Sequence, residues 1–95
     1  MPIFEWDEAK NRANKAKHNI WFEHARAAFA GPMMAWEDDR FSYEEIRWIG
    51  IGFMDVAPIV VVFTTRGETI RIISARKATK HEREAFAAWL RKGGS

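Results

Sequence analysis

Basic side chains that could hold an anionic ligand fall into two groups, one toward each end of the 95-residue chain. The first group consists of Lys10, Arg12, Lys15, Lys17 and His18, and the second of Arg76, Lys77, Lys80, His81 and Arg83. Acidic side chains gather between them, at Glu37, Asp38, Asp39, Glu44 and Glu45. A fold that brings the two basic groups together presents one positive face, as nucleic-acid-binding proteins do. The formal net charge is only +2, so the distribution of charge carries this expectation.

The residue types in these groups suit phosphate binding and proton transfer. Guanidinium groups hold phosphate through paired hydrogen bonds, and histidine exchanges protons near neutral pH. His18 is therefore a candidate acid or base. A histidine in the last turn of a helix also bonds free carbonyl groups, and the sequence leaves both roles open. His24 and His81 are expected on solvated helix surfaces.

The first half of the chain, which must position His18, is predicted to form a strand and two helices. Pro2–Trp6 alternates apolar and polar residues, and its proline favours a sheet edge. Asp7 is a good N-cap for a helix that ends at Asn19, a residue that tolerates a left-handed backbone. This helix is expected to contact its neighbour through an alanine stripe of Ala9, Ala13 and Ala16. A second helix ends before Gly31-Pro32. Its apolar face consists of Phe22, Ala25, Ala28 and Phe29.

The second half is predicted to form three strands and a closing helix. The strands are Glu45–Phe53, Ile59–Thr65 and Thr69–Ala75. Gly67 supplies a positive φ for a tight turn between the last two strands. Gly50 and Gly52 indicate that another element packs closely over the first strand. Thr79 and Glu82 match a capping box at the start of a helix that ends at Gly93-Gly94. The buried stripe of this helix is Phe86, Trp89 and Leu90.

These elements predict the α+β class. We expect an antiparallel sheet of three to four strands packed against two N-terminal helices and one C-terminal helix. A chain of this length builds one hydrophobic core, so residues 1–95 should form a single domain. The chain has no cysteine and no apolar run of membrane-spanning length. We therefore expect no disulfide, no membrane contact and a cytoplasmic location.

Strand alternation makes a prediction about two arginines. Along Thr69–Ala75 and its continuation, Arg76 shares a face with Ile72 and Ser74, and Arg71 lies on the opposite face. The sequence therefore predicts that Arg71 and Arg76 do not serve one site.

Two surface features stand between the helices and the long strands. Met33, Met34 and Trp36 lie in a stretch without a helix or strand pattern strong enough to bury all three. An exposed patch of this composition more often binds a partner than a substrate.

The three carboxylates at positions 37–39 could bind a divalent ion. No Asp or His at a suitable spacing completes such a site, so a solvated acidic loop is expected, and no metal or cofactor is predicted.

Motifs running from about Phe4 to Phe86 resemble those of the BrnT family of toxins. The motifs are Phe4-Glu5-Trp6-Asp7 with Lys10, Asn14 and Lys17-His18; Phe22-Glu23 with Ala25 and Phe29; Glu44-Glu45 with Arg47 and Ile49-Gly50; and Arg71-Ile72-Ile73-Ser74-Ala75-Arg76-Lys77-Ala78. They occur in the family's order and spacing, and the last is the most specific. The sequence departs from the family at Asn19, Phe41 and Phe86, where Gly, His and Tyr are common.

The resemblance implies a RelE-like domain that acts as a ribonuclease and blocks protein synthesis. The implied partner is a BrnA-type antitoxin with a ribbon-helix-helix DNA-binding part. The two would form a heterotetramer that represses its own operon, and only the antitoxin would contact operator DNA. Met33, Met34 and Trp36 are assigned to antitoxin binding. The alternative is a catalytically inactive RNA- or protein-binding module on the same scaffold, which the departures at Phe41 and Phe86 keep open.

Metal-independent cleavage of RNA needs a base for the 2′-hydroxyl, an acid for the leaving 5′-oxygen and cations for the phosphoryl oxygens. The candidate catalytic set is Arg66, Arg76, Arg47, Lys17, His18 and Glu45. The candidate RNA-binding set is Lys10, Arg71 and Lys77. The resemblance places family-typical charge at the three arginines of the catalytic set, which are expected to act together. Each could instead pair with a nearby glutamate. The sequence leaves open whether His18, Lys17 or Glu45 is the acid or the base.

Overall fold

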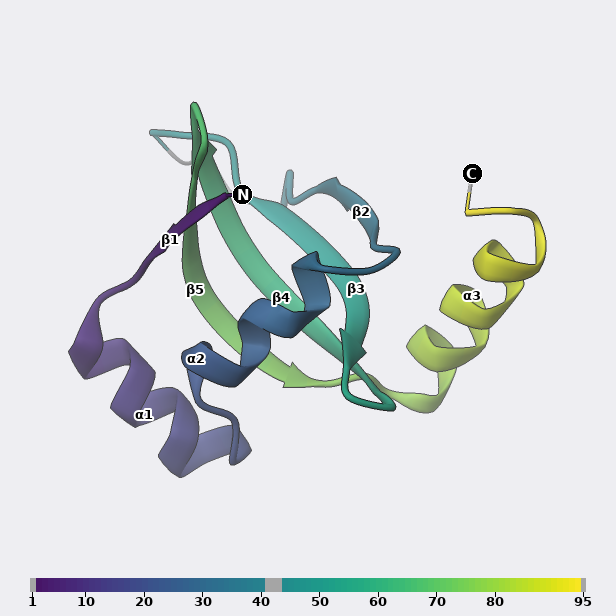
Figure 1. The fold of residues 1–95 in the computed structure, drawn as a ribbon, viewed down its shortest axis with the longest axis horizontal. Coiled ribbons are helices and arrows are strands. Elements are labelled where there is room, and N and C mark those ends of the chain that lie inside the picture. Colours follow the sequence, from purple (N-terminus) through teal and green to yellow (C-terminus); the bar gives the residue numbers. More distant parts are fainter. Residues whose placement is uncertain (1, 41–43, 95) are drawn as a thin grey trace.

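The fold is described from a computed structural model, which places residues 2–40 and 44–94. The elements in chain order are β1 Ile3–Glu5, α1 Glu8–His18, α2 Phe22–Ala25, the 3₁₀ helix η1 Arg26–Phe29, β2 Met34–Glu37, β3 Trp48–Met54, β4 Ala57–Arg66, β5 Thr69–Lys77 and α3 Lys80–Arg91 (Figure 1). The predicted α+β class is confirmed. The described residues form five strands in a mixed sheet, so the expected number of three to four strands is wrong. Three of the four strand pairings are antiparallel as expected, and the β1–β5 pairing is parallel. No helix in the described ranges is long and apolar enough to cross a membrane.

The strand order in the sheet is β1-β5-β4-β3-β2. The first strand of the chain lies parallel to the last one, a pairing between distant segments that no local sequence pattern reveals. β2 occupies the other edge, antiparallel to β3. The stretch that contains β2 was expected to be irregular, because four residues after a proline give too short an alternation to be recognised. β3 begins at Trp48, three residues later than predicted.

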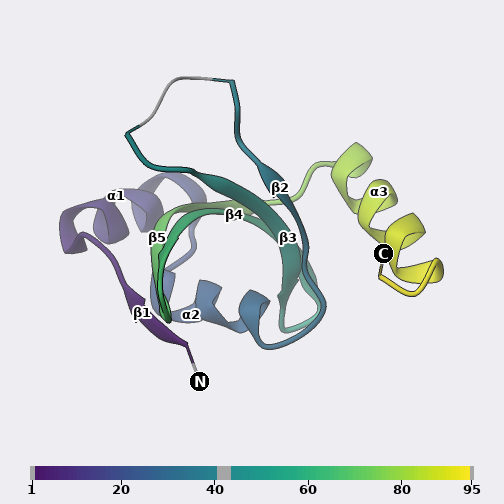
Figure 2. The same ribbon diagram turned by 90° about the horizontal axis from the view of Figure 1, so that it is seen from above.

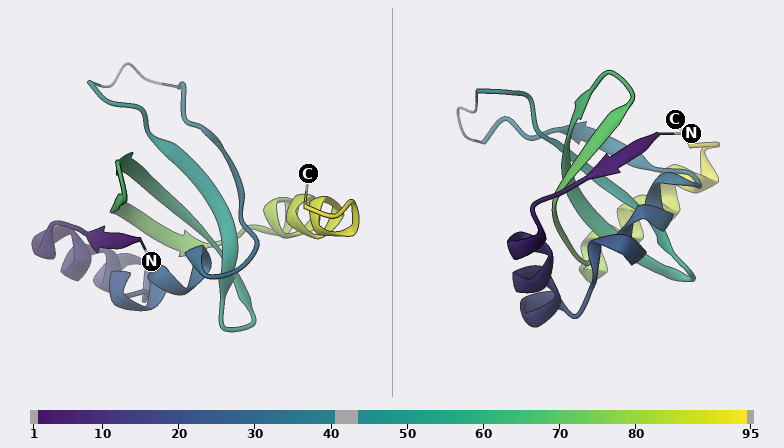
Figure 3. Two further views of the ribbon diagram at one scale, coloured as in Figure 1. Left: turned by 45° about the horizontal axis from the view of Figure 1, so that its top comes forward. Right: turned by 60° about the vertical axis from the view of Figure 1, so that its left-hand side comes forward.

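The sheet curls around α2 and η1 (Figure 2). This inner face carries the larger core, in which α2 and η1 bury the predicted helix face against β4 and β5. The buried residues of this core are Ile20, Phe22, Ala25, Ala28, Ile59, Val61, Phe63, Ile72 and Ala75. α3 covers part of the outer face through a smaller cluster of Ile51, Val60, Ala78 and Phe86. α1 and α3 therefore stand at opposite ends of the molecule (Figure 3).

α1 is held to the rest of the molecule by two buried asparagines. The Asn14 Oδ1 accepts from the Ala75 backbone N–H of β5 at 3.0 Å, and its Nδ2 donates to the Ile20 carbonyl at 2.9 Å. The Asn11 Oδ1 accepts from the Phe22 N–H at 2.7 Å. The predicted alanine stripe is wrong, since all three of its alanines are exposed. Alanine spacing indicates a face but cannot show which face has hydrogen-bond partners elsewhere in the chain.

Local features of the backbone follow the sequence closely. The Asp7 side chain caps α1 by accepting from two backbone N–H groups, and Asn19 ends the helix in the left-handed region at φ 60°. Thr79 and Glu82 form the predicted capping box of α3. Gly67 has φ +58° in the β4–β5 turn. Each of these structures depends on residues within four positions of one another, which explains why the sequence predicts them.

The two glycines of β3 lie against other elements, as predicted. A Cβ atom on Gly52 would stand 2.6 Å from the Ala28 carbonyl oxygen of η1. A Cβ atom on Gly50 would stand 2.5 Å from the Met33 sulfur. The absence of side chains here lets η1 and the segment before β2 pack directly onto the sheet.

Candidate functional site

A β-bulge in β5 decides which face of the sheet carries the arginines. Val62 pairs with Ser74 and Phe63 with Ile72, so Ile73 is an extra residue without its own partner in β4. Alternation counted straight along β5 fails at this point. Residues after the bulge lie on the face opposite to the one that a regular strand would give them.

Arg71 and Arg76 therefore share the outer face. Arg71 lies opposite Thr64 and Arg76 opposite Val60. Thr64 and Val60 are four positions apart in β4 and point to the same side. Ser74 lies between the two arginines on this face. The prediction that Arg71 and Arg76 occupy opposite faces is wrong, because it assumed a regular strand.

Three of the arginines predicted to bind phosphate are paired with carboxylates of the chain itself. The pairs are Arg66 with Glu45 at 3.1 Å, Arg71 with Glu5 at 3.6 Å and Arg76 with Glu82 at 2.7 Å. A phosphate would have to compete with a carboxylate at each of these positions. The sequence left open whether each of these arginines binds phosphate or pairs with a glutamate, and the structure shows each one paired with a glutamate.

The Arg76–Glu82 pair joins β5 to the first turn of α3. The two Nη atoms of Arg76 donate to the two carboxylate oxygens at 2.7 and 2.8 Å. Glu82 also accepts from the Thr79 N–H at 2.8 Å within the capping box. The hydrogen bonds from Arg76 lower the pKa of Glu82 to about 2, and those to Glu82 raise the pKa of Arg76. Arg76 therefore fixes the start of α3.

Arg66 and Arg76 lie at opposite ends of the β4–β5 hairpin. Arg66 pairs with Thr69 beside the turn, and Arg76 pairs with Val60, six residues farther along β4. This separation is roughly 20 Å at the usual rise of a strand. The structure does not bring the two arginines to one phosphate.

The acidic stretch at positions 37–39 is not a wholly solvated loop. Asp38 is only 5% exposed, and it binds Arg40, whose Nε donates to Oδ1 at 2.8 Å. The hydrogen bonds from Arg40 lower the pKa of Asp38, and the charge of Arg47 acts in the same direction. Within residues 2–40 and 44–94, no three His, Cys, Asp or Glu side chains gather in a group that could hold a metal ion. Arg47 itself is half-buried just before β3.

One buried side-chain polar group has no hydrogen-bond partner among the residues that the structure places. The Thr64 hydroxyl, opposite Arg71 on the outer face, is buried and makes no hydrogen bond to any of them. Thr64 is not among the predicted site residues. A threonine inside an apolar strand gives no signal of an unpaired hydroxyl.

A hollow of about 230 Å³ lies between α1 and the bulged part of β5, and we call it the α1–β5 cleft. Its lining residues are Lys10, Ala13, Asn14, Lys17, His18, Ile73 and Ser74. Lys10, Asn14 and Lys17 share one face of the helix because they are four and three residues apart. The cleft thus brings together three residues predicted from the sequence, Lys10, Lys17 and His18. Ser74, which was not among the predicted site residues, comes from the most specific motif.

The cations of the α1–β5 cleft differ from the arginines in their neighbours. Among the residues that the structure describes, no carboxylate lies within ion-pair distance of Lys10 or Lys17. Lys77, at the exposed end of β5, likewise has no such partner there. The charges at the cleft are therefore available to a ligand, whereas those of Arg66, Arg71 and Arg76 are already matched.

The residues assigned to partner binding lie in or beside β2. Trp36 is 40% exposed on this edge strand. Met33 and Met34 are half-buried, and Met33 packs against the larger core and Met34 against the smaller one. Trp36 is thus the member of the group whose exposure fits a partner surface.

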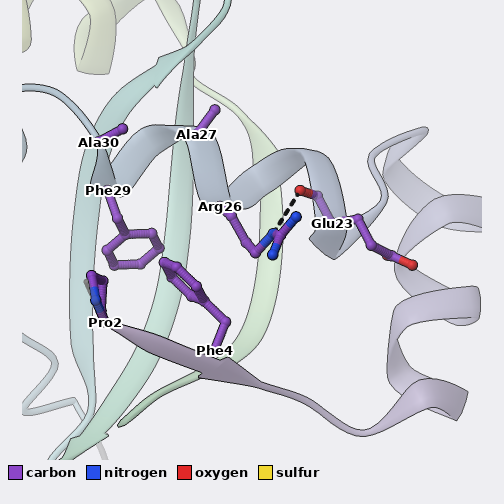
Figure 4. A pocket seen from close by; sticks show the side chains of 7 residues that line it. All are labelled: Pro2, Phe4, Glu23, Arg26, Ala27, Phe29 and Ala30. Carbon is purple, nitrogen blue, oxygen red and sulfur yellow. Dashed lines mark hydrogen bonds between the residues drawn. The ribbon is translucent and has the colours of Figure 1, made fainter. Parts of the chain in front are cut away.

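A second hollow, of about 410 Å³, opens between β1 and η1 (Figure 4). The Phe4 and Phe29 rings meet edge to face at 5.4 Å in its wall. Arg26 lies over the Phe4 ring at 5.9 Å, and its Nε donates to the Glu23 carbonyl at 3.1 Å. None of the residues predicted for catalysis, RNA binding or antitoxin binding lines this hollow. It is not the predicted site.

One of the two departures that kept an inactive module open has a structural explanation. Phe86 is 1% exposed and packs between Phe53 and Trp89, with ring centroids 5.0 and 5.9 Å away. The ring belongs to the core beneath α3 and does not reach the α1–β5 cleft. Phe41, the other departure, lies outside the described residues.

Comparisons with known proteins agree with this architecture. The chain matches a family model described as a ribonuclease toxin, BrnT, of type II toxin–antitoxin systems, over residues 6–82. It is also similar to the crystal structure of the Brucella abortus ribonuclease toxin BrnT, with 25% sequence identity and a TM-score of 0.66. That match covers 84% of this chain and 100% of the other. No curated protein matches. The chain therefore belongs to the BrnT family of ribonuclease toxins of type II toxin–antitoxin systems.

Proposed function

We propose that this protein is a toxin that cleaves RNA without a metal ion and thereby stops protein synthesis in the cytoplasm. The family match over residues 6–82 is the observation that carries the proposal. The geometry supports it through the α1–β5 cleft, which joins a histidine, two lysines free of carboxylate partners in the described structure and a serine hydroxyl. Cleavage by transesterification requires proton transfer and cations for the phosphoryl oxygens, and these side chains can provide both.

The direct test is cleavage of RNA by purified protein in excess EDTA. We expect fragments to accumulate with time, in proportion to enzyme, and at an unchanged rate when Mg²⁺ is added. Intact RNA at every protein concentration would refute ribonuclease activity and favour the inactive binding module. Loss of cleavage in EDTA with recovery on adding Mg²⁺ would refute metal independence alone.

The partner in this proposal is a BrnA-type antitoxin that carries a ribbon-helix-helix DNA-binding part. We propose that it forms a heterotetramer with the toxin and is alone in contacting operator DNA. Met33, Met34 and Trp36 at the β2 edge are the proposed docking residues, with Trp36 as the exposed anchor. Aromatic anchors of this kind dominate many interfaces.

Two measurements test the partner. Expression of the toxin should arrest growth, and co-expression of the neighbouring small gene should relieve the arrest. The substitution Trp36→Ala should weaken the purified complex by about tenfold or more. The matched change Trp89→Ala, on the buried side of α3, should lower the free energy of unfolding but leave the affinity of the folded protein for the antitoxin unchanged. Equal affinity of Trp36→Ala and the parent would place the docking surface elsewhere.

A further inference from the structure

We propose that the α1–β5 cleft holds the scissile phosphate of the RNA, with Lys17 and Ser74 as its ligands, His18 as proton acceptor and Lys10 as proton donor. The inference rests on the proposed function, because it locates the cleavage step within the molecule. It moves the chemistry away from Arg66, Arg71 and Arg76, whose charges are matched by Glu45, Glu5 and Glu82.

The availability of charge is the first step of the argument. Within the described residues, Lys10 and Lys17 have no carboxylate at ion-pair distance, and both are exposed on the cleft side of α1. A phosphate that binds here need not displace an internal anion. At Arg76, by contrast, it would have to break two hydrogen bonds to Glu82, of 2.7 and 2.8 Å.

The fixed position of the cleft walls is the second step. Asn14 stands at the floor of the cleft, and both polar atoms of its side chain are used, one on Ala75 and one on Ile20. This ties the middle of α1 to β5. Asn14 is therefore a positioning residue that holds the helical wall, and its cations, at a constant distance from the strand.

The bulge at Ile73 provides the third step. Ser74 follows the extra residue and lines the cleft at the edge of the sheet, where β1 no longer covers β5. Its hydroxyl has no hydrogen-bond partner among the described residues. It can donate to a phosphoryl oxygen while the Lys17 ammonium balances the negative charge.

The spacing along α1 gives the fourth step. Lys10 and His18 are eight residues apart, or about 12 Å at the rise of an α-helix. They bracket the cleft, so their side chains can approach a phosphate between them from opposite sides. An in-line displacement needs this arrangement, because the attacking and leaving oxygens lie on opposite sides of phosphorus.

The reaction is a balanced transesterification. His18 accepts the proton of the 2′-hydroxyl as its oxygen forms a bond to phosphorus. The bond from phosphorus to the 5′-oxygen breaks, and Lys10 gives that oxygen a proton. The products are a 2′,3′-cyclic phosphate and a 5′-hydroxyl end, and solvent restores the proton to Lys10 and removes it from His18.

The test uses two versions of an oligonucleotide that contains a cleavage site of the parent enzyme. One has the natural 5′-oxygen at the cleaved bond, and the other has sulfur there, which departs as a thiolate and needs no proton. Lys10→Arg keeps the charge but cannot release a proton. We expect it to lower kcat on the oxygen substrate by about 10²-fold to 10⁴-fold and to cleave the sulfur substrate at the parent rate.

His18→Gln and Lys17→Gln separate the other roles. His18→Gln should slow both substrates to a similar degree, because each still needs its 2′-hydroxyl deprotonated. Lys17→Gln should raise KM about tenfold, the equivalent of one lost contact, on both substrates. Lys15→Arg and Lys15→Gln are matched controls, since the Lys15 ammonium donates to Asn19 and lies over Trp21, outside the cleft lining. Both should cleave at the parent rate.

The outcomes distinguish this inference from the proposed function. If the parent cleaves RNA and Lys10→Arg and His18→Gln do so equally well, the cleft is not the site. Loss of activity in Arg47→Ala together with unaffected cleft variants would place the site near Arg47. If Lys10→Arg is equally slow on both substrates, Lys10 is not the proton donor. If the folded parent leaves all RNA intact, the proposed function itself fails. Circular dichroism of each variant confirms that loss of activity is not loss of folding.

Discussion

The buried side chain of Asn14 links α1 to β5, two segments that are far apart in sequence, by hydrogen bonds. Its removal by Asn14→Ala would leave the Ala75 N–H and the Ile20 carbonyl without partners. We expect the free energy of unfolding to fall by about 2 to 4 kcal/mol, since each unpaired buried group costs about 1 to 3 kcal/mol. Urea denaturation measures this difference.

Ala16→Gln is the control for this prediction, because Ala16 lies on the same helix with its side chain exposed. It should change stability by less than about 0.5 kcal/mol. If Ala16→Gln were the more destabilising of the two, α1 would dock through its alanines, as the sequence pattern indicated, and not through its asparagines.

Glu82 makes stability depend on pH in the acid range. Arg76 lowers the pKa of this carboxyl from 4.5 to about 2 in the folded protein. A depressed carboxyl pKa stabilises the fold above the unfolded value, and that contribution disappears as the pH falls from about 4.5 toward 2. Allowing for the partial exposure of Arg76, the contribution is of order 1 kcal/mol.

The measurement is the urea midpoint of the parent and of Glu82→Gln between about pH 6 and pH 2. The parent should lose stability in this window more steeply than the variant, and the two curves should converge at the acid end. Parallel curves across the whole window would show that Glu82 is not held by Arg76 in solution.

At the scale of elements, two glycines of β3 lie in close contact with other parts of the chain, Gly52 with a backbone and Gly50 with a side chain. Gly52→Ala would push a methyl group against the backbone of η1, whereas Gly50→Ala would meet the flexible end of Met33. We expect Gly52→Ala to cost about 1 to 3 kcal/mol, as overpacked core positions do, and Gly50→Ala to cost less. Thermal denaturation of the two variants measures both. A reversed order would mean that η1 yields more easily than Met33.

The bulge in β5 shows where prediction from sequence stops. The capping residues and the turn at Gly67 were predicted because their partners are a few positions away. The extra residue at Ile73 is visible only from the partner strand β4, and it changed the face assigned to Arg76. The parallel pairing of β1 with β5 was missed for the same reason, since the two strands stand at opposite ends of the chain.

The candidate site was predictable in part. Lys10, Lys17 and His18 were recognised because a helical spacing and their charges are local properties. The position of Ser74 opposite these three residues could not be predicted, because it depends on how α1 packs against the sheet. The ion pairs of Arg66, Arg71 and Arg76 also join segments that are distant in the chain or fixed by tertiary packing. The spacing of residues therefore could not distinguish a catalytic role from a structural one.

At the scale of the whole molecule, attraction of RNA depends on local charge, because the net charge is only +2. Three phosphate contacts to a single strand should weaken binding roughly twentyfold between about 50 and 200 mM salt. Fluorescence anisotropy with a 2′-O-methyl oligonucleotide, which cannot be cleaved, measures this dependence. The double variant Lys10→Gln, Lys17→Gln should bind more weakly and lose most of the salt dependence. An unchanged slope would place the RNA on another surface.

The two edge strands of the sheet, β1 and β2, differ in how readily a strand of another chain could pair with them. On one side β1 is only three residues long. Beyond it the bulge at Ile73 interrupts the ladder of β5, and Asn14 occupies the Ala75 N–H. Short or interrupted edges resist strand addition. β2 at the other side is four residues of regular strand. Among the strands that the structure describes, β2 is thus the edge open to pairing, with an antitoxin strand or a second copy, and a single such pairing does not extend into an open-ended polymer. Overproduced toxin should therefore form closed pairs in preference to fibres.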